Sequence, residues 1–425
     1  MAGEYLKIGV VGAGFIVKAS HVPAISQLKK CVIKGFFDIK KELAEEAKKM
    51  YLGQLKKHKN PVLDTAMAET KIYDSLESML DDVDIIDIAT PPKYHLENLK
   101  AAVDAGKHVI CEKPLERNWW AVNQYSDTLQ AIKDKKVKFV LHTQTIWNPI
   151  IKAGRDLLAS GAAGDIEVIR TLQNGADPKH TVELAALWDK FHAGGGALTD
   201  IGPHPYSAMW YWLGGDYKPY SVVAKLLEAR VPVRAIAGKA GTKVTVEDDA
   251  HVKIKWQNHE GHEIDGDLEA TWNKRDWAEG MKIGGPSVLN YHVRGSKGDF
   301  TLSPIFNLAK PVGLGAGYVI NGKDGSKKAV KFSLPKAKIE DVIFFDDFMD
   351  VVNGNAETRN NIEFAEDMLK VFGAAYLSRK RGGSNVTIEE YLAYSNDIAK
   401  DYSTMEEQTA AIIRDLFVDM DGSSK

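Results

Sequence analysis

The sequence predicts two domains: an α/β domain built on a parallel sheet, then an α+β domain with a large, mostly antiparallel open sheet and C-terminal helices. Three observations support this expectation. The chain has 425 residues, more than one domain usually holds. Its first part alternates short apolar runs with helical patterns, and its later part alternates polar and apolar residues with a period of two.

Five apolar runs in the first domain predict strands that are buried on both faces. They are Leu6–Val11, Cys31–Phe37, Ile85–Ala89, His108–Cys111 and Lys138–Leu141. The helices predicted between them are Lys40–Met50, Lys93–Ala105 and Trp119–Lys133. The stretch Gly53–Lys71 has no strand pattern and predicts a partly helical insertion, because structureless loops of that length are uncommon.

Period-two alternation marks the second domain. It occurs in His251–Trp256 and between Glu263 and Trp272, and it is typical of antiparallel strands with one solvent-facing side. The chain then has a helical pattern from Ile339 to Met420. Residues 1–146 are therefore expected to form the first domain and 147–425 the second, with 388–425 as a helical extension.

Composition excludes several classes of protein. The net charge of −3 argues against a dedicated nucleic-acid binder, and no apolar run is long enough for a bilayer. The N-terminus lacks a secretory signal pattern, and the only two cysteines, Cys31 and Cys111, lie in apolar runs. We therefore expect buried free thiols, a cytoplasmic location and no membrane partner.

A glycine-rich turn follows the first predicted strand. Gly12, Gly14, Phe15 and Ile16 lie in a Gly-x-Gly-x-x-Val string before a helical pattern, so the Rossmann fingerprint lacks its third glycine. Such a turn holds a pyrophosphate at a helix N-terminus.

Asp38 ends the second predicted strand, at the separation where an acid binds the adenosine ribose of NAD. The neighbouring Lys40 and Lys41 leave NADP as an alternative cofactor. Asp38 would also serve as the N-cap of the helix that follows.

Three further motifs carry a family resemblance. They are Thr90-Pro91-Pro92-Lys93-Tyr94-His95, Cys111-Glu112-Lys113-Pro114, and the run from Gly194-Gly195-Gly196 through Asp200-Ile201-Gly202-Pro203-His204. From about Ile8 to Ile388 the chain resembles the Gfo/Idh/MocA family (glucose–fructose oxidoreductase, inositol dehydrogenase and rhizopine catabolism). The resemblance implies an NAD-dependent oxidoreductase that transfers a hydride between the nicotinamide and a ring secondary hydroxyl of a sugar, inositol or glycoside.

The resemblance also implies roles for single residues. Lys113, Asp200 and His204 match the family's catalytic positions. Cofactor-binding positions are matched by Thr90, Pro91, His95, Glu112 and again Lys113. The chain departs from the pattern at Val17 and in Gln144–Pro149, which only loosely matches the start of the family's second domain.

The chemistry of these residues is plausible by itself. Oxidation of a carbinol needs a base, and histidine titrates near neutral pH. Asp200 lies one helical turn before His204, so both side chains are expected on one helix face, with Pro203 and Pro205 confined to the first turn. The Lys113 ammonium would stabilise developing alkoxide charge.

Other candidates have weaker support. His21, His142, His180 and His192 are scattered along the chain and show no metal-ligand spacing, so no metal is expected. Trp188 and Lys190 are assigned to the pocket edge, with the core as an equal alternative for Trp188. The aromatic cluster Trp210-Tyr211-Trp212 is expected in the core.

Two functional alternatives stay open. One is an NAD-dependent enzyme that cleaves glycosides by transient oxidation, and the other is a non-catalytic regulator that senses sugars or dinucleotides. A homodimer or homotetramer is expected, because the family pairs its subunits through the open sheet. In the extension, Tyr391, Tyr394, Ile398, Tyr402 and Met405 form an apolar stripe that would pack either on its own subunit or on a neighbour.

Overall fold

The computed structural model describes residues 5–174, 188–228, 244–272, 288–305, 315–333 and 339–418. The chain forms two compact units. Unit 1 comprises Met1–Glu116, Val122–Trp147 and Lys336–Ala365, and unit 2 comprises Arg117–Ala121, Asn148–Pro335 and Glu366–Lys425. The expected boundary at residues 146 and 147 stays a prediction. The structure adds that the segment 336–365 joins unit 1, which its helical pattern alone did not indicate.

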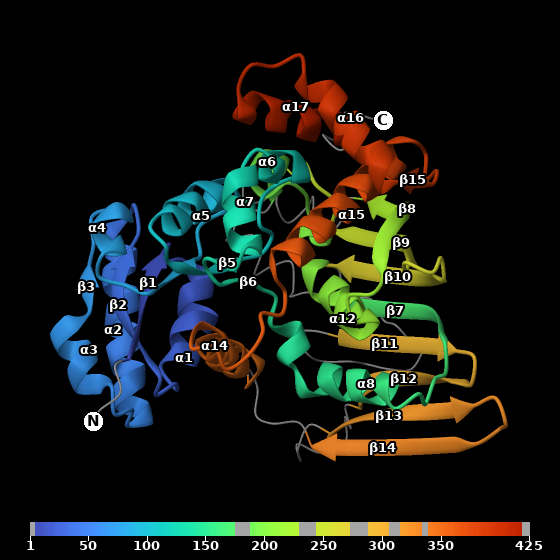
Figure 1. Cartoon of the computed structure of the whole chain (residues 1–425), viewed down its shortest axis with the longest axis horizontal. Coiled ribbons are helices and arrows are strands. Elements are labelled where there is room, and N and C mark those ends of the chain that lie inside the picture. The colour runs from blue at the N-terminus through green and yellow to red at the C-terminus, as the bar shows by residue number, and fades with distance from the viewer. Residues whose placement is uncertain are drawn as a thin grey trace. The chain divides into compact units, whose positions relative to one another are not determined.

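Unit 1 contains a six-stranded sheet of order β3-β2-β1-β4-β5-β6 in which each neighbouring pair is parallel (Figure 1). The strands are β1 (Leu6–Val11), β2 (Cys31–Phe37), β3 (Lys71–Ile72), β4 (Ile85–Ile88), β5 (His108–Glu112) and β6 (Phe139–His142). The five predicted strands are confirmed within one residue at each end. Strand β3 was not predicted, because two residues are too few to show a periodic pattern.

Helices accompany these strands, and all but the last two connect one strand to the next. They are η1 (Val17–His21), α1 (Val22–Ile25), α2 (Lys41–His58), α3 (Leu63–Glu69), α4 (Glu77–Leu80), η2 (Pro92–Tyr94), α5 (His95–Asp104), α6 (Trp119–Asn123, of which residues 119–121 belong to unit 2), α7 (Ser126–Lys133), η3 (Gln144–Trp147) and α14 (Ile339–Val352). Helices α2 and α3 fill most of Gly53–Lys71, as predicted for a partly helical insertion. The single helix predicted from Trp119 to Lys133 is instead the pair α6 and α7.

The strand order places β1 beside β4 at the point where the direction of winding reverses. In open parallel sheets, ligands bind at this point, beyond the carboxyl ends of the strands. Gly12, Asp38 and Lys113 directly follow β1, β2 and β5, and Thr90 lies two residues after β4. The predicted cofactor-binding residues of unit 1 therefore extend from one edge of its sheet.

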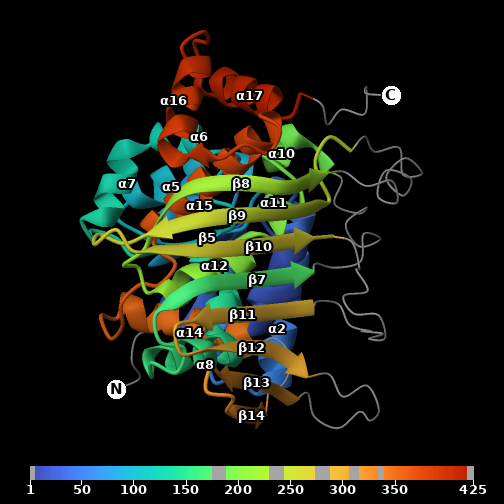
Figure 2. The same ribbon diagram turned by 90° about the vertical axis from the view of Figure 1, so that its right-hand side faces the viewer.

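Unit 2 contains a nine-stranded sheet of order β14-β13-β12-β11-β7-β10-β9-β8-β15 (Figure 2). Its strands are β7 (Ile166–Asn174), β8 (Lys218–Glu228), β9 (Asp249–Gln257), β10 (Glu263–Thr271), β11 (Val288–Gly295), β12 (Gly298–Ile305), β13 (Gly315–Gly322), β14 (Lys327–Ser333) and β15 (Val386–Thr387). All pairs are antiparallel except β7 with β10. Buried and exposed residues alternate along β9 and β10, which confirms the predicted open sheet.

Helices complete unit 2. They are α8 (Pro149–Ala159), α10 (Lys190–Ala193), α11 (Ala197–Asp200), α12 (Pro203–Leu213), α15 (Ile362–Lys380, of which residues 366–380 belong to this unit), α16 (Ile388–Ala399) and α17 (Met405–Leu416). Helix α12 packs on strands β7 and β10. Within the described residues, no helix has the length and apolar character that a membrane span requires.

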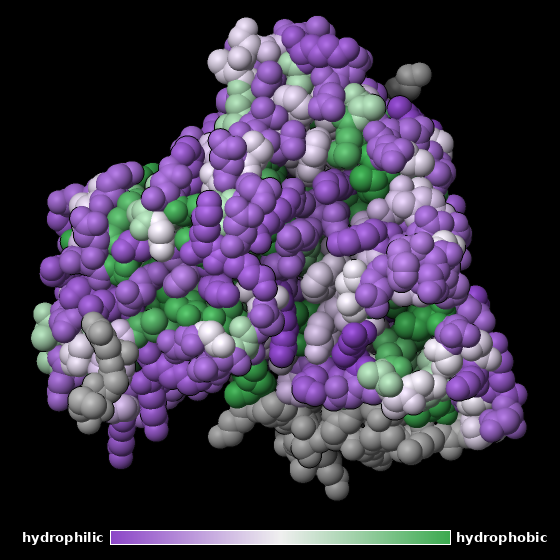
Figure 3. Space-filling model, viewed as in Figure 1, coloured by the Kyte–Doolittle hydropathy of each residue, from purple (hydrophilic) through white to green (hydrophobic). Residues whose placement is uncertain are grey.

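The C-terminal extension packs on its own chain. Helices α16 and α17 each begin with a capping box, at Thr387 and Thr404. Tyr391, Ile412 and Leu416 are buried, and Figure 3 shows a mainly hydrophilic outer surface over these helices. Of the predicted apolar stripe, Tyr391 is buried, Tyr394, Ile398 and Met405 are half-buried, and Tyr402 is exposed, so the choice between packing on its own subunit and on a neighbour stays a prediction.

Candidate active site

The first strand of unit 1 ends in the predicted glycine-rich turn. Gly12 has a φ of +86°, and a Cβ there would lie 2.6 Å from the Ala89 carbonyl oxygen, so only glycine fits. A Cβ on Gly14 would meet nothing within 4 Å, which leaves space for a phosphate group beside the backbone. Phe15 is exposed, and Ile16 is the N-cap of helix η1.

Asp38 connects the end of β2 to this turn. Its Oδ2 accepts a hydrogen bond from the Ala13 N–H at 2.7 Å, and its Oδ1 accepts one from the Lys40 N–H at 2.8 Å. Lys40 itself is the N-cap of α2, so Asp38 does not cap that helix as the alternative prediction had it. The next side chain, Ile39, is 91% exposed and, with Phe15, offers apolar surface beside the carboxylate.

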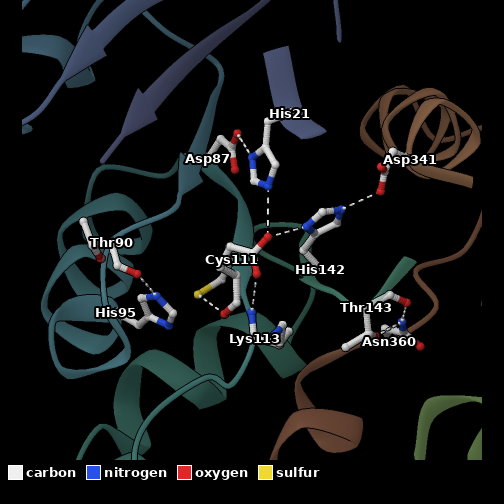
Figure 4. Close-up of polar contacts among 11 residues, drawn as sticks. His21, Asp87, Thr90, His95, Cys111, Lys113, His142, Thr143, Asp341 and Asn360 are labelled. Carbon is white, nitrogen blue, oxygen red and sulfur yellow. Dashed lines mark hydrogen bonds and ion pairs between the residues drawn. The ribbon is translucent and has the colours of Figure 1, made fainter. Parts of the chain in front are cut away.

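His95 joins two of the predicted loops. Its Nε2 lies 2.6 Å from the Thr90 carbonyl oxygen (Figure 4). Its Nδ1 lies 2.9 Å from the Pro114 carbonyl oxygen. Burial lowers the pKa of His95, and a neutral ring donates its single N–H to one of these two carbonyl oxygens at a time. The ring thereby links the Thr90–Pro91 loop to the turn that follows Lys113.

The side chain of Glu112 binds the backbone of Lys113. The Glu112 Oε2 accepts a hydrogen bond from the Lys113 backbone N–H at 3.1 Å. Its Oε1 lies 2.9 Å from Nε2 of His21 and 2.5 Å from Nδ1 of His142. The Nδ1 of His21 lies 2.8 Å from an Asp87 carboxylate oxygen (Figure 4). We call the side chains of Glu112, His21, His142 and Asp87, together with Asp341 near His142, the Glu112 cluster.

Charge within the Glu112 cluster is well defined. Burial alone would lower the pKa of His21, but Asp87 and Glu112 outweigh it and raise this pKa to about 10. Burial would raise the pKa of Glu112, but His142 and His21 hold it well below its usual value. At neutral pH, an imidazolium therefore lies between two carboxylates, and each of its N–H groups donates to one of them.

His21 and His142 show no metal-ligand spacing in the sequence, but the fold brings them together at Glu112. In the described ranges, His21, Glu112 and His142 are the set whose possible metal-ligand atoms all lie within 4.8 Å of one another. A metal would need His21 deprotonated, whereas the ion-paired arrangement holds it protonated, and the expectation that no metal binds stays a prediction. One signal for this pairing was present, because Glu112 and His142 are register partners at the ends of parallel strands β5 and β6.

The predicted acid–base pair lies in unit 2. Asp200 ends α11, and His204 is the second residue of α12, so the expectation that one helix carries both is wrong, whereas Pro203 and Pro205 lie in the first turn of α12 as predicted. Pro203 lacks a backbone N–H, which fits the helix boundary between Asp200 and His204. The Asp200 Oδ2 accepts a hydrogen bond from the Trp272 indole at 2.8 Å, and His204 is 9% exposed.

Glu247 organises the glycine run before Asp200, a role that sequence reasoning missed. Its carboxylate accepts hydrogen bonds from the Gly196 N–H at 3.1 Å and the Leu198 N–H at 2.9 Å. The Tyr376 hydroxyl donates to it at 2.8 Å. Burial raises the pKa of Glu247 to about 7, against the opposing effect of these donors. A Cβ on Gly196 would lie 1.8 Å from the Glu247 carbonyl oxygen, which explains one glycine of the run.

The remaining candidates have structural roles. Trp188 is fully buried against Trp272 with ring centroids 4.8 Å apart, which resolves it as core. Lys190 is buried, and its Nζ donates to the Phe417 carbonyl at 3.4 Å. Trp212 is in the core as expected, whereas Trp210 and Tyr211 are half-buried. His192 contacts Asp189 at the surface, His180 lies outside the described residues, and Cys31 and Cys111 are buried free thiols as predicted.

Comparison with known families identifies both parts of the chain. Residues 6–143 match the family described as "Oxidoreductase family, NAD-binding Rossmann fold", and residues 151–301 match the "GFO/IDH/MocA C-terminal domain". Together, the two matches cover more than half of the sequence.

Individual relatives agree with these matches. The levoglucosan dehydrogenase of Pseudarthrobacter phenanthrenivorans is 29% identical over 326 residues, 72% of this chain and 74% of the relative. The glucose-6-phosphate 3-dehydrogenase of Bacillus subtilis is 26% identical over 52% of this chain and 57% of its own length. A solved levoglucosan dehydrogenase in complex with NADH and levoglucosan shares the fold, with a TM-score of 0.68 and 21% identity over 91% of this chain and all of that one.

Proposed function

The chain belongs to the Gfo/Idh/MocA family of NAD-binding oxidoreductases, and on that premise we propose that it oxidises a ring secondary hydroxyl of a sugar, inositol or glycoside. The observation that carries the proposal is the common position of Gly12, Asp38 and Lys113. Each follows the carboxyl end of a parallel strand of unit 1, where a nucleotide and its reaction partner bind in such sheets.

The residues present fit a dinucleotide. The Gly12 turn excludes a side chain, and Gly14 leaves space beside the backbone for a pyrophosphate. Asp38 is half-buried, accepts backbone hydrogen bonds and would repel a 2′-phosphate, which favours NAD over NADP. Exposed Phe15 and Ile39 would cover an adenine ring. Bound NAD supplies a nicotinamide carbon that accepts a hydride.

The chain's own residues would handle the proton and the charge. As the C–H bond of the carbinol breaks and the carbonyl forms, His204 takes the hydroxyl proton. The Lys113 ammonium stabilises negative charge on the reacting oxygen. Asp200 supports the imidazolium that His204 becomes. In the reverse direction, His204 returns the proton to the new hydroxyl.

The substrate class rests on the relatives. Levoglucosan, glucose 6-phosphate and scyllo-inositol appear in their names, and each presents a ring secondary hydroxyl. We propose that this chain acts on a substrate of the same class. We also propose a cytoplasmic location and a homodimer or homotetramer paired through the open sheet of unit 2, which light scattering would test.

The decisive experiment is a panel of anhydrosugars, hexoses, hexose phosphates, inositols, uronates and aryl glycosides with NAD and with NADP, followed by NADH absorbance. Saturable NADH formation with one of the cyclic polyols is the expected result. Release of the aryl group without net NADH would instead favour the glycoside-cleaving alternative. Binding without either reaction would favour the regulator.

A further inference from the structure

Arg117 is a buried cation four residues after Lys113 in the chain. Its side chain is 2% exposed, although guanidinium groups stay charged in proteins. Nη1 donates to the Phe191 carbonyl at 3.0 Å and to Oε1 of Glu406 at 3.2 Å. Nη2 donates to Oε2 of Glu406 at 2.7 Å. Glu406 belongs to helix α17, so a two-point ion pair joins this buried cation to the C-terminal extension.

The backbone of Arg117 lies against the glycine run that leads to Asp200. Gly194 has a φ of +76°, and a Cβ there would lie 2.3 Å from the Arg117 carbonyl oxygen. Gly194 opens the glycine run that leads to Asp200, and Phe191 lies three residues before it. The side chain and the backbone of Arg117 thus hold one and the same turn.

Helix α17 contacts the same region at other points. The Asn118 side chain donates to the Thr409 carbonyl at 3.5 Å, and the Trp120 indole donates to the Gln408 side chain at 3.4 Å. The Phe417 ring, just after α17, packs on Tyr376 with centroids 4.5 Å apart. Tyr376 is the residue that donates to Glu247, so the extension also supports the side chain that binds Gly196 and Leu198.

We infer that the C-terminal extension is a positioning element of the active site and that Arg117 and Glu406 are its positioning residues. The inference rests on the proposed function, because it takes Lys113, Asp200 and His204 as the reacting groups. Through one ion pair, α17 fixes the segment that follows Lys113 and the turn that precedes Asp200. Small displacements of catalytic groups lower turnover strongly, since the reaction needs close approach and alignment.

The test compares Glu406→Gln with Asp397→Asn as a matched control. Both changes replace one carboxylate of the extension by an amide, but Asp397 pairs with Lys400 at the surface. We expect Glu406→Gln to lower kcat roughly 10- to 100-fold, with NADH affinity unchanged. We expect the control to equal the wild type. Wild-type kcat in Glu406→Gln would overturn the inference.

Hydrogen exchange gives a readout that does not need turnover. In Glu406→Gln, amides in Phe191–Asp200 and in Lys113–Asn118 should exchange roughly tenfold faster, while the strands of the unit 2 sheet keep their protection. Uniformly faster exchange across unit 2 would assign the pair a general structural role and overturn the inference. If Glu406→Gln does not fold, Arg117→Lys replaces it, because lysine keeps the charge but loses the two-point geometry.

The two hypotheses fail in different ways. A wild-type protein that oxidises no member of the substrate panel contradicts the proposed function. Local exchange near Gly194 would still report whether the extension holds this turn. A protein with normal turnover but no local response to Glu406→Gln contradicts the positioning role alone.

Discussion

Glu112 in unit 1 and Glu247 in unit 2 do the same work with different partners. Each is a buried carboxylate that accepts backbone N–H groups from a segment with a predicted catalytic residue. Glu112 also pairs with two histidines, whereas Glu247 accepts hydrogen bonds from backbone amides and a tyrosine hydroxyl. The pKa of Glu112 is therefore held well below its usual value, and that of Glu247 is raised to about 7.

The difference shows what a buried carboxylate needs to stay ionised. Neutral donors stabilise the charged form, but for Glu247 they do not compensate fully for the loss of water. The His21 imidazolium does compensate for the loss of water around Glu112. The carboxylate that binds the Lys113 backbone therefore keeps its charge near neutral pH. Glu247, which binds the glycine run before Asp200, in contrast changes its protonation state in the physiological pH range.

The largest expected effect tests whether the segments that Glu112 and Glu247 hold contain catalytic residues. Lys113→Ala and His204→Ala should each lower kcat by roughly 10²- to 10⁴-fold, the usual contribution of a positioned acid–base group. Steady-state rates with the substrate identified by the panel provide the measurement. Near wild-type turnover in either variant removes that residue from the mechanism. The carboxylate that binds its segment, Glu112 or Glu247, would then have a structural role only.

Removal of charge from the Glu112 cluster should cost stability. Glu112→Gln leaves the His21 imidazolium with one carboxylate partner in the core, and we expect the free energy of unfolding to fall by about 3–5 kcal/mol. Denaturant unfolding measures the change. Glu46→Gln, which alters the exposed Lys18–Glu46 pair, is the control and should cost under about 1 kcal/mol. Equal effects in the two variants would contradict the ion-pair assignment.

Glu247 should make stability fall as pH rises. Because its pKa is raised from 4.5 to about 7, its contribution is complete below pH 4.5 and is lost as pH rises through about 7. The loss is roughly 3 kcal/mol at 1.36 kcal/mol per pKa unit. The free energy of unfolding is measured against pH for the wild type and for Glu247→Gln, and the difference between the two isolates the contribution of Glu247. A difference that does not change between pH 4.5 and 7 would show that Glu247 is ionised throughout.

The smallest expected effect concerns a third carboxylate, Asp38, which also accepts a backbone N–H but is only half-buried. Partial exposure leaves it able to bind a ribose as well as the glycine-rich turn. Asp38→Ala should weaken NAD binding roughly tenfold, about the value of one charge-assisted hydrogen bond, and narrow the gap to NADP. Titration with both cofactors measures this, and a wild-type preference for NADP contradicts it.

Local patterns predicted much of this protein. The apolar runs that form β1, β2, β4, β5 and β6 are buried on both faces, so composition alone identifies them. Motif residues such as Gly12, Asp38 and Lys113 directly follow these runs. Because strand ends meet at one edge of a parallel sheet, the cofactor-binding edge followed from sequence. The position of Pro203 and Pro205 in a first helical turn also followed, but the separate short helix that ends at Asp200 did not.

The sequence by itself determined the two sheet types, the glycine-rich turn and the identity of the motif residues, because periodicity and turn chemistry act between near neighbours. Only the tertiary structure decided what supports them. His21 reaches Glu112 across 91 positions, and Arg117 reaches Glu406 across 289. Such pairs depend on strand register and on which helix end meets which loop. No local pattern records that, since a buried charge leaves the same sequence signal whether or not its partner is near.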